Sequence, residues 1–257
     1  AVWPRLWAHP FAMLSASFAK LSNVHSPEPF LGIITNTPGP QYFVIYLVAT
    51  LPIALLVLVV AWLARAFVRR ESATWVMVAW LVIPLGVMLS PVRQDGVRYV
   101  MPCVLALALC AAAGLDWIAH RFWKPAAAAV VLYLAITVVR VHPYYLDYFG
   151  EQVGGAGMVA SHRWFETAWW GEGVDRAVTY VNENAPTDAH VYRDCIEPKH
   201  LAWFRENLWA QMAKSIGDAT WIVTYAPQTH RCPIPPGFKR VWSVDANGAT
   251  LAEVWTR

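Results

Sequence analysis

One polar segment between two apolar runs has the residue types that bind an anion. Residues 90–99 read SPVRQDGVRY and contain Arg93, Asp95, Arg98 and Tyr99. A guanidinium group stays charged and donates paired hydrogen bonds, which suits both arginines to phosphate. A solvated loop in which Asp95 pairs with the two arginines is the alternative.

A second group of aromatic and titratable residues follows the last apolar run. Residues 142–148 read HPYYLDY, so Tyr144, Tyr145 and Tyr148 lie where that run ends. Tyrosines at such a position are typical of a membrane-interface belt. Stacking on a sugar or on a prenyl chain is the alternative. His142 and Asp147 could titrate, but their spacing does not bring them together.

A glycine-rich turn that contains one carboxylate precedes a predicted helix at residues 173–184, and a second carboxylate lies in the first turn of that helix. The turn reads WWGEG at residues 169–173, and Asp175 follows. A carboxylate at a helix N-terminus is stabilised by the exposed backbone amides. We therefore expect Glu172 and Asp175 to cap this helix rather than to catalyse a reaction.

The four cysteines form two pairs of different character. Cys103 and Cys110 share one face of an apolar run and are expected to be small buried hydrophobes. An oxidising compartment would allow Cys195 and Cys232 to form a disulfide. The cysteine and histidine spacings do not match a zinc site, so we expect no metal ligands among them.

Composition separates an apolar first half from a more polar second half. The chain has 257 residues, of which 57% are hydrophobic and 14% charged, with a net charge of +3. The charged fraction is well below the roughly 25% usual for soluble domains. The mild net charge, with no long block of Lys or Arg, argues against nucleic-acid binding.

Four apolar runs predict a polytopic helical membrane protein, with about four spans between residues 42 and 141. The fourth run is short, and a buried soluble helix is its alternative. Arg and Lys residues follow the first and third runs, which places those loops in the cytoplasm by the positive-inside rule. The runs cover residues 42–67, 74–91, 97–119 and 125–141.

Residues 1–41 are expected to form an external amphipathic helix and an irregular loop. The apolar residues of the helix recur at intervals of three and four, which places them on one helical face. Such a helix would lie on the outer membrane surface, or it would pack on the polar domain. The face consists of Trp7, Phe11, Leu14, Phe18 and Leu21.

Residues 142–257 are expected to form a small α/β domain outside the cytoplasm, because strand-like and helix-like segments alternate. A hairpin with its turn at residues 245–248 should end it. The expected helices cover residues 173–184 and 200–215, and the expected strands cover residues 189–192, 220–226, 238–243 and 250–256.

Three motifs occur in an order that resembles one enzyme family. They are PGPQYFVIYLVATLPIALL, DGVRYVMP, and HPYYLDYF followed by WGEG. Together they resemble the GT-C glycosyltransferases of the protein-mannosyltransferase and aminoarabinose-transferase type. Those enzymes use dolichyl- or undecaprenyl-phosphate sugars. They move a sugar from the carrier to a glycan, lipid or protein acceptor on the outer face of the membrane.

The resemblance implies roles for several residues and one missing group. It makes Arg98 and Arg93 contacts of the carrier phosphate, with Tyr99, Tyr144 and Tyr145 as further substrate-binding candidates. The family's catalytic Asp, in the first external loop, has no counterpart here. We therefore expect this chain to be the C-terminal portion of a longer bacterial inner- or cell-membrane protein, with the base upstream. A processed N-terminus is the alternative. Some relatives use a divalent metal and others do not, so no cofactor is assigned.

Two other functions compete with glycosyl transfer. A non-enzymatic, membrane-anchored module that binds a glycan or a protein would explain a polar domain without a catalytic base. A transporter fragment would explain Pro52 and Pro84 as breaks in spans. Transport sites favour ionisable residues at mid-membrane, and these runs have almost none.

Overall fold

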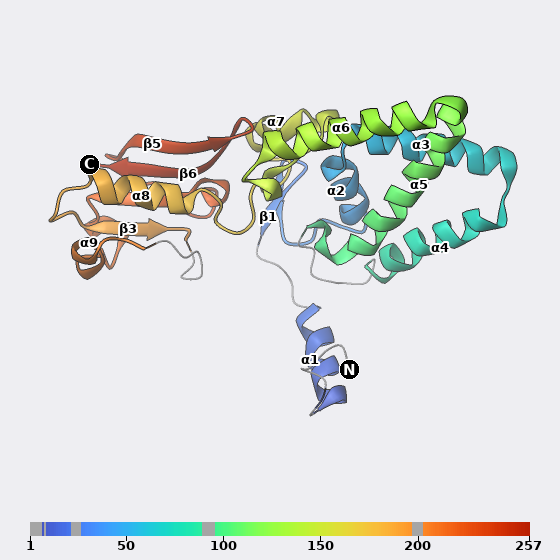
Figure 1. Ribbon diagram of the computed structural model, residues 1–257. Coiled ribbons are helices and arrows are strands. Elements are labelled where there is room, and N and C mark those ends of the chain that lie inside the picture. The colour runs from blue at the N-terminus through green and yellow to red at the C-terminus, as the bar shows by residue number, and fades with distance from the viewer. Residues whose placement is uncertain (1–6, 8, 22–26, 89–95, 197–202) are drawn as a thin grey trace. The chain divides into compact units, whose positions relative to one another are not determined.

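The chain folds into two compact units. A computed structural model describes residues 7, 9–21, 27–88, 96–196 and 203–257. Unit 1 consists of Ala1–Glu28 and Ile34–Leu134, and unit 2 consists of Pro29–Ile33 and Ala135–Arg257. Unit 1 is mainly helical, whereas unit 2 contains a four-stranded sheet with helices (Figure 1).

The N-terminal helix exposes its apolar stripe. Helix α1 (Pro10–Leu21) begins close to the expected position. Trp7, Phe11, Leu14 and Phe18 are all exposed. The short strands β1 (Glu28–Phe30) and β2 (Ile33–Thr35) then pair as a two-stranded ribbon where the sequence predicts only a loop.

Proline breaks the first apolar run into two helices. Helix α2 (Tyr42–Thr50) and helix α3 (Ile53–Arg69) meet at an angle of 118°. Pro52 has no backbone N–H, and its ring disfavours a helical conformation of the preceding residue. Leu51 is accordingly extended. The run therefore does not form one straight span.

The expectation of about four membrane spans is wrong. Helix α4 (Ser72–Val87) has 16 residues, which is short for a span. The 3₁₀ turn η2 (Val97–Val100) leads into helix α5 (Met101–Ala119), and the 3₁₀ turn η3 (His120–Phe122) joins α5 to helix α6 (Trp123–Val141). Within the described residues, the stretch Val97–Val141 is the one helix long and apolar enough to cross a membrane. The bent pair α2–α3 is a second only if it counts as a single span.

Helices α3 and α5 pack closely because a glycine faces the contact. A Cβ on Gly114 would collide with the carbonyl oxygen of Leu58 and lie 2.9 Å from the backbone nitrogen of Trp62. Cys103 and Cys110 are free and fully buried in α5, as expected for small apolar side chains. The absence of a side chain at Gly114 thus sets how near the two backbones come.

Unit 2 is built on a mixed sheet in the order β3–β4–β6–β5. Strands β3 and β4 are parallel, and β6 is antiparallel to both β4 and β5. The predicted C-terminal hairpin is present, with its turn at Asn247 and Gly248, both at positive φ. The strands are β3 (Val191–Asp194), β4 (Trp221–Tyr225), β5 (Lys239–Ala246) and β6 (Ala249–Thr256).

Helix α8 (Val174–Asn184) supplies the main helical half of the unit 2 core (Figure 1). Val174, Ala177, Val178 and Val181 form its buried face, and they pack in one cluster with residues of the sheet. This helix lies where its apolar period predicts.

The other unit 2 helices differ from the expectation. The helix expected at residues 200–215 is reduced to α9 (Glu206–Ala210), and residues 200–202 lie outside the described part of the chain. Helix α7 (Gly155–His162) was not predicted. The 3₁₀ turns are η4 (Tyr145–Asp147), η5 (Glu151–Val153), η6 (Ile216–Asp218) and η7 (Ala226–Gln228).

A disulfide joins Cys195 and Cys232, which are 37 residues apart. Cys195 directly follows β3, and Cys232 lies in the segment after η7. The bond therefore ties that segment to the end of the parallel edge of the sheet.

We predict that Gly114→Ala destabilises unit 1, because the added methyl group must push α3 away from α5. Overpacking of this kind typically costs about 1–3 kcal/mol. The matched control is Gly86→Ala in α4, where an added Cβ meets no described atom within 4 Å. Chemical unfolding of the detergent-solubilised protein should show a loss for Gly114→Ala only. Equal stability of the two variants would contradict the close helix contact.

Removing the disulfide should lower the free energy of unfolding of unit 2 by about 2–4 kcal/mol, because the unfolded chain gains freedom. The double variant Cys195→Ser, Cys232→Ser tests this in denaturant titrations. Wild-type protein treated with a reductant is the control and should behave as the double variant does. No difference between oxidised and reduced protein would count against the bond.

Candidate functional site

A buried hydrogen-bond chain in unit 1 fixes the backbone just before Arg98. The Gly96 N–H donates to the Tyr42 hydroxyl over 2.9 Å, and that hydroxyl donates to Glu28 Oε1 over 3.2 Å. Tyr42 is fully buried and Glu28 is 3% exposed. Gly96 has a φ of 69°, which favours glycine. Tyr42, at the start of α2, thus ties the first residue of β1 to the residue just before η2.

Arg98 itself points away from this interior. Its side chain is exposed, and its guanidinium carbon lies 5.2 Å from the centre of the Tyr99 ring. Val100, two residues on, is fully buried and anchors the turn. Arg93 and Asp95 lie outside the described residues. The structure therefore places Arg98 and Tyr99 together at the start of the apolar stretch Val97–Val141.

Two of the tyrosines predicted for substrate binding, Tyr144 and Tyr145, lie in unit 2 and differ in exposure. Tyr145 is 52% exposed, and its hydroxyl is 2.7 Å from His142 Nδ1. Tyr144 packs against the unit 2 core, with the Arg176 guanidinium 5.6 Å from its ring centre. Only Tyr145 is therefore open to a ligand. Neither unit contains all the residues predicted for substrate binding.

Glu172 closes a turn instead of capping α8. Its Oε2 atom accepts hydrogen bonds from the Trp169 and Trp170 amides over 3.0 and 2.9 Å. The residue before the helix, Gly173, has no side chain and sits at a φ of 83°. The expectation that Glu172 caps this helix is wrong, because its carboxylate points back along the chain. Asp175 does lie in the first turn.

Asp147 is an acid sealed in the interior of unit 2. Its carboxyl group is fully buried, and neither oxygen has a hydrogen-bond partner of good geometry within the described residues. Burial raises the pKa of Asp147 to about 8, with the charge of Glu172 adding to the rise and the Ala168 amide opposing it. Asp147 is therefore largely protonated at neutral pH.

Two more buried groups share this interior. Glu166 is 4% exposed and accepts hydrogen bonds from Gln228 over 2.8 Å and from Arg231 over 3.5 Å. Burial raises the pKa of Glu166, and the Gln228 and Arg231 side chains offset part of the rise. Burial is also the main reason that the pKa of Tyr225 is raised well above its ordinary value, with Glu172 next. Sequence motifs gave no signal for Glu166 or Tyr225.

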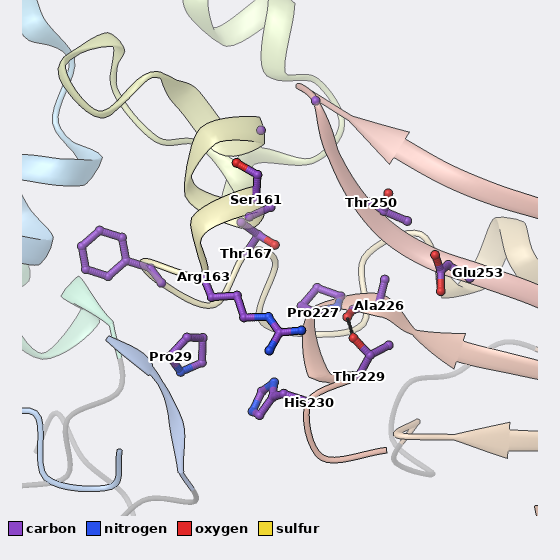
Figure 2. Close-up of a pocket in the computed structure, with 14 residues that line it drawn as sticks. Pro29, Ser161, Arg163, Thr167, Ala226, Pro227, Thr229, His230, Thr250 and Glu253 are labelled. Atoms are coloured by element: carbon purple, nitrogen blue, oxygen red, sulfur yellow. Dashed lines mark hydrogen bonds between the residues drawn. The ribbon is translucent and has the colours of Figure 1, made fainter. Parts of the chain in front are cut away.

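An open pocket of about 340 Å³ lies on unit 2 beside this interior. Figure 2 shows the side chains that line it, from the end of α7, from η7 and the residues after it, and from β6. Gly157 in α7 approaches Gly248 closely, since a Cβ on Gly157 would lie 3.0 Å from the Gly248 carbonyl oxygen. The polar lining includes Ser161, Arg163, Thr229, His230, Thr250 and Glu253.

The described residues contain no group of three or more His, Cys, Asp or Glu side chains that could hold a metal ion. Glu166 and Glu253 both already have cationic or donor partners within unit 2. The arginine and hydroxyl side chains of the pocket can bind an anion and form hydrogen bonds.

Comparisons with known proteins place the chain in no family. No family model matches it, and neither a curated protein nor a solved structure matches it. The likeness of its motifs to GT-C glycosyltransferases therefore remains a resemblance. The functional argument rests on the residues themselves.

We predict that Asp147 makes unit 2 less stable as pH rises. The pKa of Asp147 is raised from 3.8 to about 8 on folding, so the unfolded chain ionises first. The free energy of unfolding should then fall between about pH 4 and pH 8 and level off above that range. Asp147→Asn should flatten this fall and be more stable than wild type at pH 8. Chemical unfolding at several pH values measures both.

The control for this measurement is Asp188→Asn, which changes an exposed carboxylate in the same unit. It should follow the wild-type profile. An Asp147→Asn profile that also follows wild type would show that Asp147 is ionised in the folded protein at neutral pH.

Proposed function

We propose that this chain is the carrier-binding part of a membrane-bound glycosyltransferase that uses a polyprenyl-phosphate sugar. The observation that carries the proposal is the buried Glu28–Tyr42–Gly96 chain, which fixes the segment carrying exposed Arg98. Buried hydrogen-bonded groups define a single backbone position. A fixed backbone just before Arg98 lowers the conformational entropy that this segment loses when the guanidinium binds a phosphate.

The surface of the apolar stretch supports membrane attachment. Leu105, Leu109, Val131 and Val139 each have at least half of their surface exposed. Full burial of such a side chain contributes roughly 1.5–3 kcal/mol of free energy relative to full exposure to water. A bilayer would bury the part of each side chain that is exposed here. Arg98 precedes this apolar surface, so its guanidinium would lie at headgroup depth, where the carrier phosphate also lies.

The disulfide supports the location of unit 2. Bonds of this kind persist in oxidising compartments such as the periplasm or the cell exterior. Cys195 and Cys232 form one in unit 2, whereas Cys103 and Cys110 in unit 1 are free and buried. We therefore assign unit 2 to the outer side of the membrane, where the resembling enzymes transfer their sugars.

In this proposal Arg98 stabilises the leaving group. When the sugar C–O bond to the carrier breaks, negative charge grows on the phosphate oxygens. A preorganised guanidinium lowers the energy of that charge and so lowers the barrier. The described residues of this chain are assigned carrier binding and charge stabilisation only, and the proton transfer from the acceptor is not assigned to them.

A membrane-anchored glycan-binding module is the second candidate. The pocket on unit 2 favours it, because Arg163 and several hydroxyl groups line one open hollow. One assay distinguishes the two functions. A binding module retains a glycan without transferring any sugar to it, whereas the transferase moves the sugar from the carrier to the acceptor and releases the lipid phosphate.

We predict that Arg98→Ala weakens binding of undecaprenyl phosphate to the full-length protein in nanodiscs. A charge-assisted hydrogen bond contributes about 1.5–3 kcal/mol, which is roughly 10- to 100-fold in affinity. Arg98→Lys should lose less, since it keeps the charge but not the paired donors. Arg69→Ala is the matched control, because this arginine is also exposed in unit 1 but lies at the end of α3.

Sugar transfer by the Arg98→Ala protein should fall at least as far as its affinity for the carrier. If Arg98→Ala and Arg69→Ala bound the lipid phosphate as tightly as wild type, the role of Arg98 would be excluded.

A further inference from the structure

We propose that the pocket on unit 2 binds a sugar that carries a negative charge, either a carboxylate or a phosphate. This inference does not rest on the glycosyltransferase proposal, because it concerns a different unit and a ligand without a lipid. Three features of the pocket carry it: a cation that forms no ion pair with the described residues, hydroxyl groups whose protons are already used, and nearby carboxylates that already have partners.

Arg163 supplies the positive charge. It ends α7 in the left-handed region, with a φ of 51°, and its backbone N–H donates to Ala160. Its side chain is exposed and makes no ion pair or hydrogen bond with the residues that the structure describes. Figure 2 shows this side chain extending toward Thr229 and His230. The guanidinium can therefore meet a ligand anion without breaking a contact within the described residues.

The imidazole of His230 lies at the same end of the pocket. Its Nε2 atom accepts a hydrogen bond from Arg231 Nε over 3.2 Å. In the neutral ring the proton then belongs on Nδ1, which makes that nitrogen a donor. Arg163 and His230 together favour a ligand group with several acceptor oxygens, as carboxylates and phosphates have.

The hydroxyl groups of the lining select for sugar hydroxyls. Ser161 donates to the Met158 carbonyl over 3.0 Å, Thr229 to the Ala226 carbonyl over 3.0 Å, and Thr250 to Asp245 Oδ1 over 2.6 Å. Each hydroxyl proton is thus used within the protein, and the oxygen lone pairs remain as acceptors. A ligand must bring its own O–H donors, and a sugar has several of them spaced around its ring.

The carboxylates near the pocket do not cancel the charge of Arg163. Glu253 Oε1 accepts from Arg240 over 2.7 Å, and its Oε2 accepts from Trp255 Nε1 over 3.1 Å. Glu166 is held by Gln228 and Arg231. A third acid, Asp245, accepts hydrogen bonds from the Thr250 and Ser243 hydroxyl groups. Since all three acids have partners, the guanidinium of Arg163 is the positive charge left for a ligand.

The disulfide fixes the backbone segment that forms one side of the pocket. His230 lies two residues before Cys232, and the bond to Cys195 ties this segment to the end of β3. The backbone carrying Thr229 and His230 is therefore held in place before a ligand arrives, which reduces the entropy lost on binding.

The test is calorimetric titration of the full chain in detergent with four probes: glucuronate, glucose 1-phosphate, glucose and inorganic phosphate. We expect one or both charged sugars to bind at least tenfold more tightly than glucose and than phosphate. Arg163→Gln should lower that affinity at least tenfold. The matched control Lys239→Gln removes an exposed charge from β5 of the same unit and should leave affinity unchanged.

A second variant tests recognition of the sugar hydroxyl groups separately from recognition of the anion. Thr229→Val keeps the side-chain shape and removes a hydrogen-bond acceptor. It should therefore weaken binding of the charged sugar and leave the affinity for inorganic phosphate unchanged. A preference for glucuronate identifies the anion as a carboxylate, and a preference for glucose 1-phosphate identifies a phosphate.

Three results would overturn the proposal: glucose binding as tightly as the charged sugars, inorganic phosphate binding as tightly as they do, or no binding of any probe. Arg98 variants distinguish this proposal from the carrier proposal, because they should weaken lipid-phosphate binding and leave the affinities for these four probes unchanged.

Discussion

The buried hydroxyl of Tyr42 is the interaction on which the position of Arg98 depends. It accepts from Gly96 and donates to Glu28, so one side chain joins three segments that are far apart in the sequence. Leaving a buried donor or acceptor unpaired costs about 1–3 kcal/mol. Each of the three groups therefore requires the other two, and the turn before the apolar stretch has one favoured position.

In unit 2, burial acts on carboxyl groups and destabilises their charged forms. Its interior holds Asp147 and Glu166 at a cost, because burial raises the pKa of both carboxyl groups. The surface nearby keeps Arg163 exposed and without an ion pair among the residues described. The acids inside the unit are thus buried or paired, and a positive charge is left at the pocket. This arrangement makes the pocket attractive to anions even though neighbouring carboxylates are close.

The sequence correctly predicted elements that depend only on the residues of their own segment. The apolar period of α8 and the β-branched run of β4 are both found where the sequence places them. The lengths of the apolar runs predicted the wrong number of membrane spans, because Pro52 breaks one run and α4 is short. The pocket was not predicted, since Arg163, His230 and Thr250 meet only through tertiary packing. Glu28 was missed for the same reason: no motif marks a side chain whose partner is a distant tyrosine.

The most direct test of the central claim is the lipid-phosphate affinity of Tyr42→Phe in the full-length protein. This change removes the hydroxyl group but keeps the ring, which contacts Phe43 and Tyr46. If the hydrogen-bond chain positions Arg98, affinity for undecaprenyl phosphate should fall severalfold while Arg98 is still present and the helical content is unchanged. Wild-type affinity in a folded Tyr42→Phe protein would contradict the account.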